Sequence, residues 1–138
     1  MICKNIFIDS DIILDVFIQR DPYYSYAQKL LNKGINSEFK IHTSALVIAN
    51  IYYITAKALG KNDTKDKINK LLKMLTVLPL DTESISLALN SNFNDMEDAM
   101  QHFVALRNEC DLIITRNLKH YKKSLLPVMT AEQFIRKF

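Results

Sequence analysis

The stretch Asn94-Asp95-Met96-Glu97-Asp98-Ala99 holds three acidic residues within four positions and runs into a helix-like segment, 100–110. Residues three apart share one face of a helix, so we expect Asp95 and Asp98 to point the same way and Glu97 to be rotated away. Acidic side chains in a first helical turn are also favoured by the helix dipole, typically by about 0.3–1 kcal/mol each. The stretch alone is therefore compatible with a ligand site and with an ordinary helix start.

Two strand-like segments end in polar side chains. The apolar run 112–114 predicts a buried strand that closes on Thr115-Arg116-Asn117. Near the N-terminus the apolar run 6–8 stops at Asp9-Ser10-Asp11, and apolar residues then recur at helical spacing over 12–17. A strand followed by an acid and a helix places that acid at the carboxyl edge of a parallel sheet, where α/β proteins bind ligands.

We therefore hypothesise that Asp9, Asp95 and Asp98 meet in one divalent-metal pocket. Mg²⁺ and Mn²⁺ prefer oxygen ligands, and crowded carboxylates repel one another unless a cation lies between them. In the alternative interpretation, Asp9 or Ser10 only caps the following helix.

Strand-like and helix-like segments alternate along the whole chain. The expected strands are 6–8, 39–43, 77–80, 112–114 and 127–129. This alternation predicts a single α/β domain over 1–138, a three-layer α/β/α sandwich with a central, mostly parallel sheet of about five strands. Right-handed crossovers then bring the carboxyl ends of all strands to one edge.

Two of the expected helices have clear boundary signals. Asp21-Pro22 predicts an N-cap and a first helical position, and Gly34 predicts the end of that helix. Thr43 or Ser44 is expected to cap a second helix, 45–59, which is apolar on nearly all sides. We therefore expect this second helix to be central.

The acidic helix has its own boundary signal. Asn94 is expected to be its N-cap, with Glu97 three residues later as in a capping box. His102 is expected to be a packed or surface residue. No second histidine stands at ligand spacing from it, which argues against a zinc site.

Two features allow more than one interpretation. Asn50 is a polar residue in an apolar stretch, and a buried amide without partners costs about 1–3 kcal/mol, so it either bonds to neighbouring backbone or faces the pocket. Tyr23, Tyr24 and Tyr26 favour a packing surface or partner contact over a base-stacking platform.

Composition and charge narrow the class of protein. The chain is 49% hydrophobic and 24% charged, which is typical of a globular domain, and its formal charge of +3 permits a nucleic-acid partner without demanding one. Cys3 and Cys110 show no motif spacing and indicate reduced thiols. With neither a secretory signal nor a membrane-spanning run in evidence, we expect a cytoplasmic location.

These motifs together resemble the PIN-domain proteins, the fold of VapC-type toxins in bacterial toxin-antitoxin pairs. Residues 8–12 resemble the family's first strand with its leading metal-binding aspartate, and 44–50 resemble its second motif. The Asp95-x-Glu97-Asp98-Ala99 segment is similar to the third motif, with Asp98 at the metal-binding position. The fourth, 115–117, stands where the family usually has Thr-x-Asp. The four motifs occur in the family's order and cover nearly the whole chain.

The chain departs from the family pattern at two positions. The second motif usually supplies a glutamate where this chain has Asn50, and the fourth usually supplies an aspartate where it has Asn117. The chain thus resembles a branch with Asn in place of two of the usual acids. Two formal negative charges are missing, although an amide oxygen can still serve as a neutral ligand.

The resemblance implies a metal-dependent endoribonuclease that hydrolyses RNA phosphodiester bonds with Mg²⁺ or Mn²⁺, and that acts as the toxin of a pair. It implies RNA as substrate, an antitoxin protein as a possible partner, and a homodimer as a further option. The alternative is a catalytically weak or inactive PIN domain acting as an RNA- or partner-binding module.

Residue roles follow from the matching positions. Asp9 and Asp98 would be metal ligands, Asp95 an added ligand, and Asn117 a fourth member of the catalytic set. The supporting residues would be Ser10, Asn50 and Thr115, and the RNA-binding residues Arg116 and Lys119.

Overall fold

The computed structural model describes residues 3–36 and 38–138, and five parallel strands form its centre. The strands are β1 (Asn5–Ile8), β2 (Lys40–Ser44), β3 (Thr76–Leu78), β4 (Leu112–Ile114) and β5 (Val128–Met129), in the order β3-β2-β1-β4-β5. Every strand expected from the sequence is present, with small shifts at the ends. The predicted α/β fold with a parallel sheet is confirmed.

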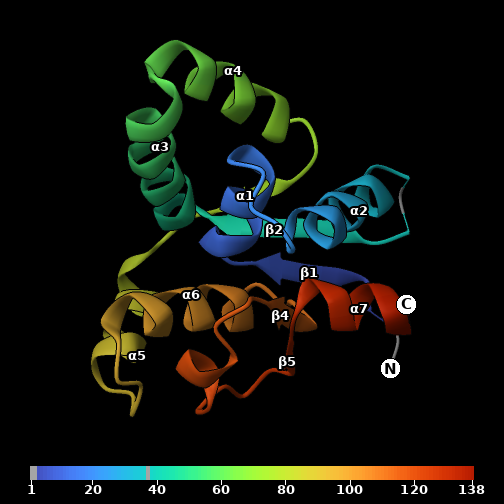
Figure 1. Ribbon diagram of the computed structural model, residues 1–138. Coiled ribbons are helices and arrows are strands. Elements are labelled where there is room, and N and C mark those ends of the chain that lie inside the picture. The colour runs from blue at the N-terminus through green and yellow to red at the C-terminus, as the bar shows by residue number, and fades with distance from the viewer. Residues whose placement is uncertain (1–2, 37) are drawn as a thin grey trace.

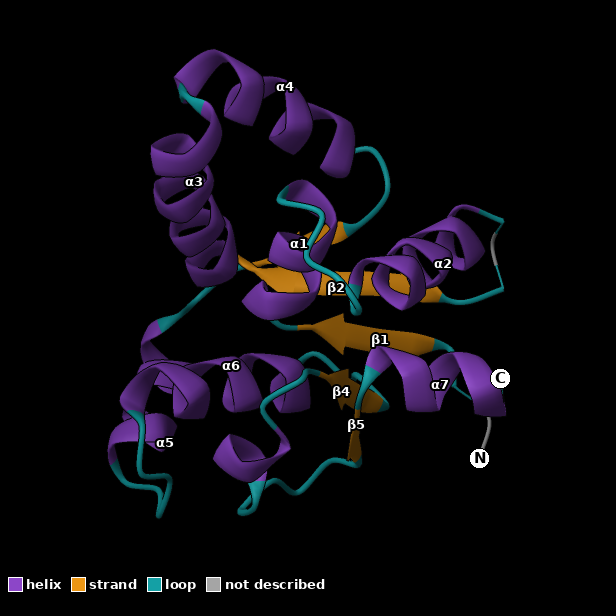
Figure 2. Ribbon diagram, viewed as in Figure 1, coloured by secondary structure: helices purple, strands orange, loops and turns teal. Residues whose placement is uncertain are grey.

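Helices separate the strands along the chain (Figure 2). They are α1 (Ser10–Phe17), α2 (Tyr24–Ile35), α3 (Ala45–Leu59), α4 (Lys61–Leu71), α5 (Thr82–Leu89), α6 (Met96–Arg107), the 3-10 helix η1 (Leu118–Tyr121) and α7 (Ala131–Lys137). Figure 1 shows α1–α4 on one side of the sheet and α5 and α6 on the other. The sheet is therefore the middle layer of an α/β/α sandwich, as predicted.

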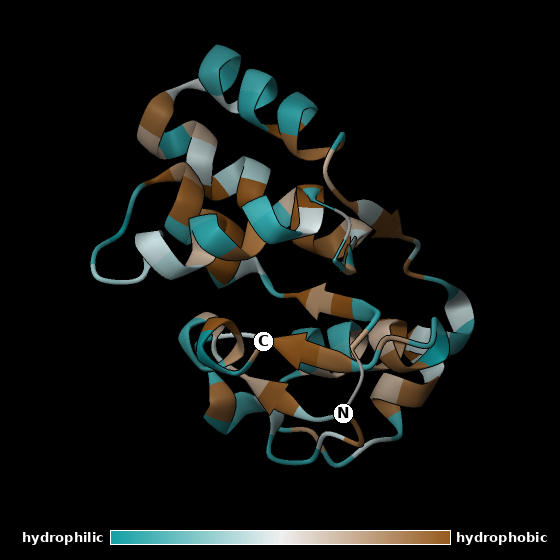
Figure 3. Cartoon of the chain, turned by 90° about the vertical axis from the view of Figure 1, so that its right-hand side faces the viewer, coloured by the Kyte–Doolittle hydropathy of each residue, from teal (hydrophilic) through white to brown (hydrophobic). Residues whose placement is uncertain are grey.

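The two central strands are the most apolar part of the core. Ile6, Phe7 and Ile8 of β1 are fully buried, and so are all residues of β4. Both strands are covered on two faces, which explains their continuous apolar runs, and apolar burial of this kind contributes about 25 cal/mol per Å². Figure 3 shows these apolar strands between helices, with the hydrophilic α4 on the outside.

The connections change direction at β1. The chain leaves β1 for β2 on one side, whereas β4 pairs with β1 on the other side. The crevice at the carboxyl ends of β1 and β4 is therefore the switch point of the sheet, where open α/β folds bind ligands. It is closed at its base because the Asp9 N–H donates to the carbonyl oxygen of Ile114 (3.1 Å).

Two sequence-based boundaries of α2 are wrong. Asp21 and Pro22 lie in a turn, in which the N–H groups of Tyr23 and Tyr24 both donate to the Arg20 carbonyl (3.0 and 2.9 Å), and the helix begins only at Tyr24. At the other end, Gly34 lies inside the helix, which continues to Ile35.

The expectation that α3 is central is also wrong. Its boundaries and its Ser44 cap are as predicted, but the helix packs in the outer layer against α1 and α4. Tyr53 and Ile54 are 62% and 43% exposed. The apolar composition could not distinguish a buried helix from one with an exposed apolar face. Among the helices of residues 3–36 and 38–138, none is long and apolar enough to cross a lipid bilayer.

Gly34 is required by close packing between α2 and β2. A Cβ atom added to Gly34 would lie 2.3 Å from Cδ1 and 2.8 Å from Cγ1 of Ile41. Ile41 is only 2% exposed, so its side chain has little room to move away. The glycine therefore allows the helix to approach the strand.

Gly34→Ala is expected to lower the free energy of unfolding by about 1–2 kcal/mol, because the overpacking outweighs the better helix propensity of alanine. Chemical denaturation measures this change. Ile41→Val removes Cδ1 and should recover about half of the loss when combined with Gly34→Ala. Strictly additive effects of the two substitutions would contradict the packing explanation.

Candidate active site

Carboxylates from both ends of the chain line one pocket at the switch point. The pocket has a volume of about 380 Å³. Its acidic lining residues are Asp9, Asp11, Asp95, Glu97 and Asp98. The structure therefore brings together the three acids that the sequence analysis proposed, and it adds two more. We refer to this site as the acidic pocket.

Asp9 is held from three sides. It follows β1 directly, and its Oδ1 accepts a hydrogen bond from the Ser10 N–H (2.7 Å). Its Oδ2 accepts hydrogen bonds from the Tyr121 hydroxyl (3.0 Å) and the Thr115 hydroxyl (3.2 Å). Burial raises the pKa of this carboxyl. Asp9 therefore caps α1 and lines the pocket, so the two interpretations of this residue are compatible.

Asp95, and not Asn94, is the N-cap of α6. Its Oδ1 accepts a hydrogen bond from the Asp98 N–H (2.9 Å). Asparagine and aspartate cap helices equally well, so the sequence could not choose between adjacent positions. The cap fixes Asp95 next to Asp98 at the start of the helix. Burial, followed by the charge of Asp95, raises the pKa of Asp98 to about 6.

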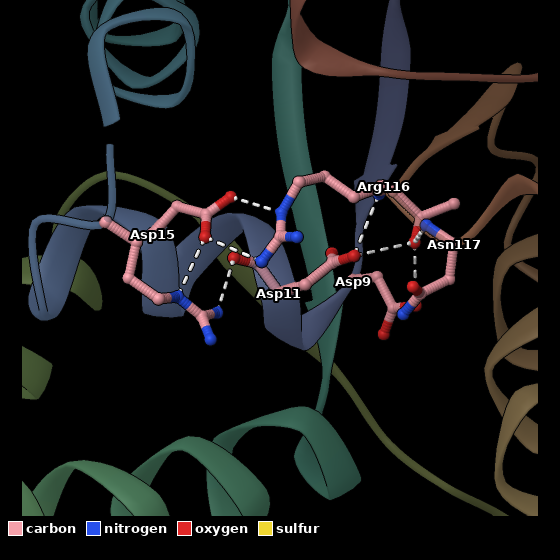
Figure 4. A network of polar contacts seen from close by, with 7 residues as sticks. Asp9, Asp11, Asp15, Arg116 and Asn117 are labelled. Carbon is pink, nitrogen blue, oxygen red and sulfur yellow. Dashed lines mark hydrogen bonds and ion pairs between the residues drawn. The ribbon is translucent and has the colours of Figure 1, made fainter. Parts of the chain in front are cut away.

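Asp11 was not assigned a role by sequence. Its Oδ2 accepts hydrogen bonds from the Arg116 N–H (2.8 Å) and from the Thr115 hydroxyl (3.1 Å). Burial, followed by the charge of Asp9, raises its pKa to about 6. The sequence signal for Asp11 was its position two residues after Asp9, directly after β1. Both carboxylates line the pocket, and Asp11 also contacts the residues that follow β4. Figure 4 shows Asp9 and Asp11 beside Asn117.

Asn50 lies on α3 and does not line the acidic pocket, but it contacts a residue that does. Its Nδ2 donates a hydrogen bond to Oε1 of Glu97 at 2.6 Å. Glu97 was expected to be rotated away from the two aspartates, yet it lines the same pocket. The amide at position 50 therefore holds a carboxylate near the site instead of supplying one.

An ion-pair cluster around the buried Asp15 borders the acidic pocket (Figure 4). Asp15, 1% exposed, accepts hydrogen bonds from Nε and Nη2 of Arg116 at 2.8 and 2.9 Å and from Nε of Arg20 at 3.0 Å. The Arg116 guanidinium also lies 4.0 Å from the centroid of the Tyr23 ring. Arg116, expected to contact RNA, is thus fixed by protein partners. The sequence signal for Asp15 was weak because its main partner lies 101 residues away.

The two histidines near the site differ in environment. His120, on η1, is exposed, and its Nδ1 lies 3.1 Å from Oδ2 of Asp98. His102 is fully buried, and its Nε2 accepts a hydrogen bond from the Leu125 N–H (3.0 Å). Burial lowers the pKa of His102 to about 4. His102 is therefore a packed residue, in agreement with the sequence-based expectation, whereas His120 lines the acidic pocket. Lys119 is exposed on η1 and does not line the pocket itself.

The donor set of the acidic pocket fits a hard divalent cation. All five acidic residues offer oxygen, and Oδ1 of Asp11 and Oγ of Ser10 are buried atoms without a hydrogen-bond partner among the described residues. Over 3–36 and 38–138, no three His, Cys, Asp or Glu side chains are grouped closely enough to hold an ion by themselves. Mg²⁺ sites commonly use one or two carboxylates and retain several waters.

Comparison with known proteins finds a matching family and a curated relative. The model of the PIN-domain family matches residues 5–119. Ribonuclease VapC1 of Aquifex aeolicus is 25% identical over 136 residues, which is 95% of this chain and 93% of the relative.

Solved structures with the same fold include toxin-antitoxin complexes. The DNA-bound VapBC of Salmonella typhimurium matches with a TM-score of 0.70 and 13% identity, over 93% of this chain and 98% of the other. A toxin-antitoxin complex from Klebsiella pneumoniae gives a TM-score of 0.68 and 17% identity, over 91% and 96%. Likeness at this level of identity shows a shared fold.

Asp98→Asn is expected to stabilise the metal-free protein near pH 7.5. The pKa of about 6 in the folded state exceeds the ordinary 3.8, so the folded state binds this proton more tightly than the unfolded chain does. The contribution of Asp98 to stability is therefore full below about pH 4 and lost as the pH rises through about 6. A neutral amide should raise the free energy of unfolding by roughly 1 kcal/mol, a figure reduced for solvent screening.

Urea denaturation of both proteins near pH 7.5 and pH 4 measures this difference, which should shrink at the lower pH. The matched control is Asp66→Asn on the exposed side of α4, which should change stability little at either pH. A loss of stability in Asp98→Asn at both pH values would contradict the proposed carboxylate repulsion.

Proposed function

We propose that this chain, which belongs to the PIN-domain family, is a divalent-metal-dependent endoribonuclease that hydrolyses phosphodiester bonds in RNA. The observation that carries the proposal is the meeting of Asp9, Asp95 and Asp98 in one pocket at the switch point of the sheet. The relative that is named a ribonuclease supports the choice of reaction.

Asp9 and Asp98 would hold the Mg²⁺ or Mn²⁺ ion, with Asp95 as a further ligand and Asn117 as a neutral one. A bound divalent ion supplies two effects: it polarises a phosphoryl oxygen and lowers the pKa of an attacking water. Burial, and for Asp98 next the charge of Asp95, raises the pKa values of Asp9 and Asp98, and a bound cation would favour the ionised form of both.

Neighbouring residues would position these ligands. The hydroxyl groups of Tyr121 and Thr115 donate to the same oxygen of Asp9, so the orientation of this carboxylate is fixed. The Asn117 N–H in turn donates to Oγ1 of Thr115 at 3.1 Å. Hydrogen-bonding partners of metal ligands typically contribute about 10- to 100-fold in metal affinity or activity.

Basic side chains beside the pocket would attract the RNA backbone. Lys119, Lys122 and Lys123 are exposed on or just after η1. Their charges lie on the segment that also contributes His120 to the pocket, and lysines that neutralise phosphates make binding dependent on salt. Arg116 adds positive charge, although Asp15 holds its guanidinium in place.

The same comparisons support a toxin that is paired with an antitoxin protein. The matched structures from Salmonella typhimurium and Klebsiella pneumoniae are toxin-antitoxin complexes. We include a separately encoded antitoxin and a second copy of this chain among the proposed partners.

One observation favours a second candidate, an RNA- or partner-binding module with little or no cleavage. Asn50 and Asn117 are neutral, and Asn50 donates to Glu97 instead of offering a carboxylate of its own. Any replacement for the two missing carboxylates must then come from Asp95 and Glu97, both at the start of α6. The two candidates differ in their requirement for metal.

Purified wild-type protein is expected to cleave structured RNA with Mg²⁺ or Mn²⁺ and to lose cleavage with EDTA. Asp9→Asn and Asp98→Asn should each lower the rate at least about 100-fold, because a lost ligand costs more than a lost partner of a ligand. Tyr121→Phe should lower it about 10-fold. Single-turnover cleavage, followed by gel electrophoresis, measures these rates.

The matched control is Asp66→Asn, which should cleave at the wild-type rate. Full activity of Asp98→Asn would refute the metal site proposed here. RNA binding that depends on salt but not on metal, without formation of a cleavage product, would support the second candidate instead.

Expression of the wild-type chain in a bacterial host is expected to slow growth, and Asp9→Asn should abolish this effect at equal protein levels. Co-expression of the product of a short reading frame next to the gene should restore growth. Growth rate and immunoblotting measure both outcomes. Equal growth inhibition by Asp9→Asn would argue against a nuclease toxin.

A further inference from the structure

A second pocket lies next to the acidic pocket and shares a wall with it. It has a volume of about 270 Å³, and Arg116 and Asn117 line both pockets. Its other walls come from α1, from the turn before α2, and from the start of α7. We propose that this second pocket binds one nucleobase of the RNA strand whose phosphate lies in the acidic pocket, an inference that rests on the proposed function.

One wall of the second pocket is formed by the Tyr23 ring and the Arg116 guanidinium. The guanidinium lies 4.0 Å from the ring centroid, and two hydrogen bonds to Asp15 hold it there. Bases of single-stranded RNA stack on aromatic rings and on guanidinium planes. This wall therefore offers the type of surface that a base requires, already in place before binding.

The remaining walls combine apolar and polar groups. Ile12, Pro22 and Tyr26 are apolar or aromatic, whereas Thr130 and Glu132 are polar. The Thr130 oxygen accepts the Gln133 N–H (3.1 Å), which leaves its O–H available as a donor. A nucleobase has apolar faces and hydrogen-bonding edges, so it matches this mixture better than a purely apolar side chain, which would leave the polar groups unpaired.

Asn117 adds a polar group where the two pockets meet. In the described part of the chain its side-chain amide has no hydrogen-bond partner, although its backbone N–H donates to Thr115. A side-chain amide can both donate to and accept from a base edge. The Asn117 amide can therefore bind either a metal ion in the acidic pocket or a base in the second pocket.

Size and position also favour a single base. The volume of about 270 Å³ is below the roughly 300–1,000 Å³ of pockets for drug-sized ligands. A base is joined to its backbone phosphate through one ribose, so a phosphate in one pocket directs a base toward the next. The sequence favoured a half-buried packing surface or a partner contact for the tyrosines. Tyr23 packs against Arg116, is 43% exposed and lines this pocket as well.

Binding of nucleotides tests the second pocket without requiring cleavage. Wild-type protein labelled with ¹⁵N would be titrated with the four ribonucleoside 5′-monophosphates and with ribose 5-phosphate, in the absence of metal. We expect the backbone amides of Tyr23, Asn117 and Ala131 to shift with at least one nucleotide and not with ribose 5-phosphate. Equal shifts with ribose 5-phosphate, or no shifts with any nucleotide, would overturn the proposal.

Substitutions at Tyr23 test whether nucleotide binding requires a flat ring for stacking or only an apolar side chain. Tyr23→Leu keeps an apolar side chain without a flat ring and should weaken nucleotide binding about 10-fold, whereas Tyr23→Phe should bind within about 2-fold of wild type. Tyr53→Ala, at an exposed tyrosine of α3, is the matched control and should bind normally. Equal binding by Tyr23→Leu and Tyr23→Phe would contradict stacking.

RNA cleavage gives an independent readout. Removal of one base next to the cleaved bond should lower kcat/KM about 10-fold in wild type, and the same removal should cost Tyr23→Leu almost nothing. If RNA is cleaved but removal of any single base leaves kcat/KM unchanged, the proposed base pocket is refuted and the ribonuclease assignment stands. If no RNA is cleaved, the proposed function fails, and the nucleotide titration still decides the pocket. Loss of antitoxin binding alone in Tyr23→Leu would reassign the pocket to a protein partner.

Discussion

One hydroxyl group, that of Thr115, lies within hydrogen-bonding distance of two buried carboxylates, Asp9 and Asp11. A hydroxyl has a single proton and can donate to only one of them at a time. The contact joins the end of β1 to the end of β4, so the switch point of the sheet is built around two acids that repel each other. Asp95, Glu97 and Asp98 at the start of α6 line the same pocket.

The nearby positive charge does not neutralise that pair. Arg20 and Arg116 form their ion pairs with the buried Asp15, while the side chains of both arginines stay partly exposed, and Arg116 donates to the Asp11 carboxylate through its backbone N–H. Both arginines also line the acidic pocket, but their guanidinium groups form ion pairs with Asp15. The pocket therefore holds five acidic residues beside two arginines that already have a carboxylate partner.

Much of the fold was predictable because it depends on local patterns. The short apolar runs of β1 and β4 and the cap of α3 at Ser44 each carry their own signal. The outer position of α3 was not predictable, since burial depends on neighbours that the sequence of one helix does not contain. In the site, Asp9 and Asp98 could be proposed from motif order. Tyr121, which donates to Asp9 across 112 residues, had no local signal at all.

The pairing of β1 with β4 has a consequence for synthesis of the protein. Asp9 leaves the ribosome early, whereas its partners Thr115 and Tyr121 are translated more than a hundred residues later. Chains emerge N-terminal end first, so the nascent polypeptide cannot assemble the acidic pocket until most of it has been made. Whatever the acidic pocket binds, it can bind only after nearly the whole chain has left the ribosome.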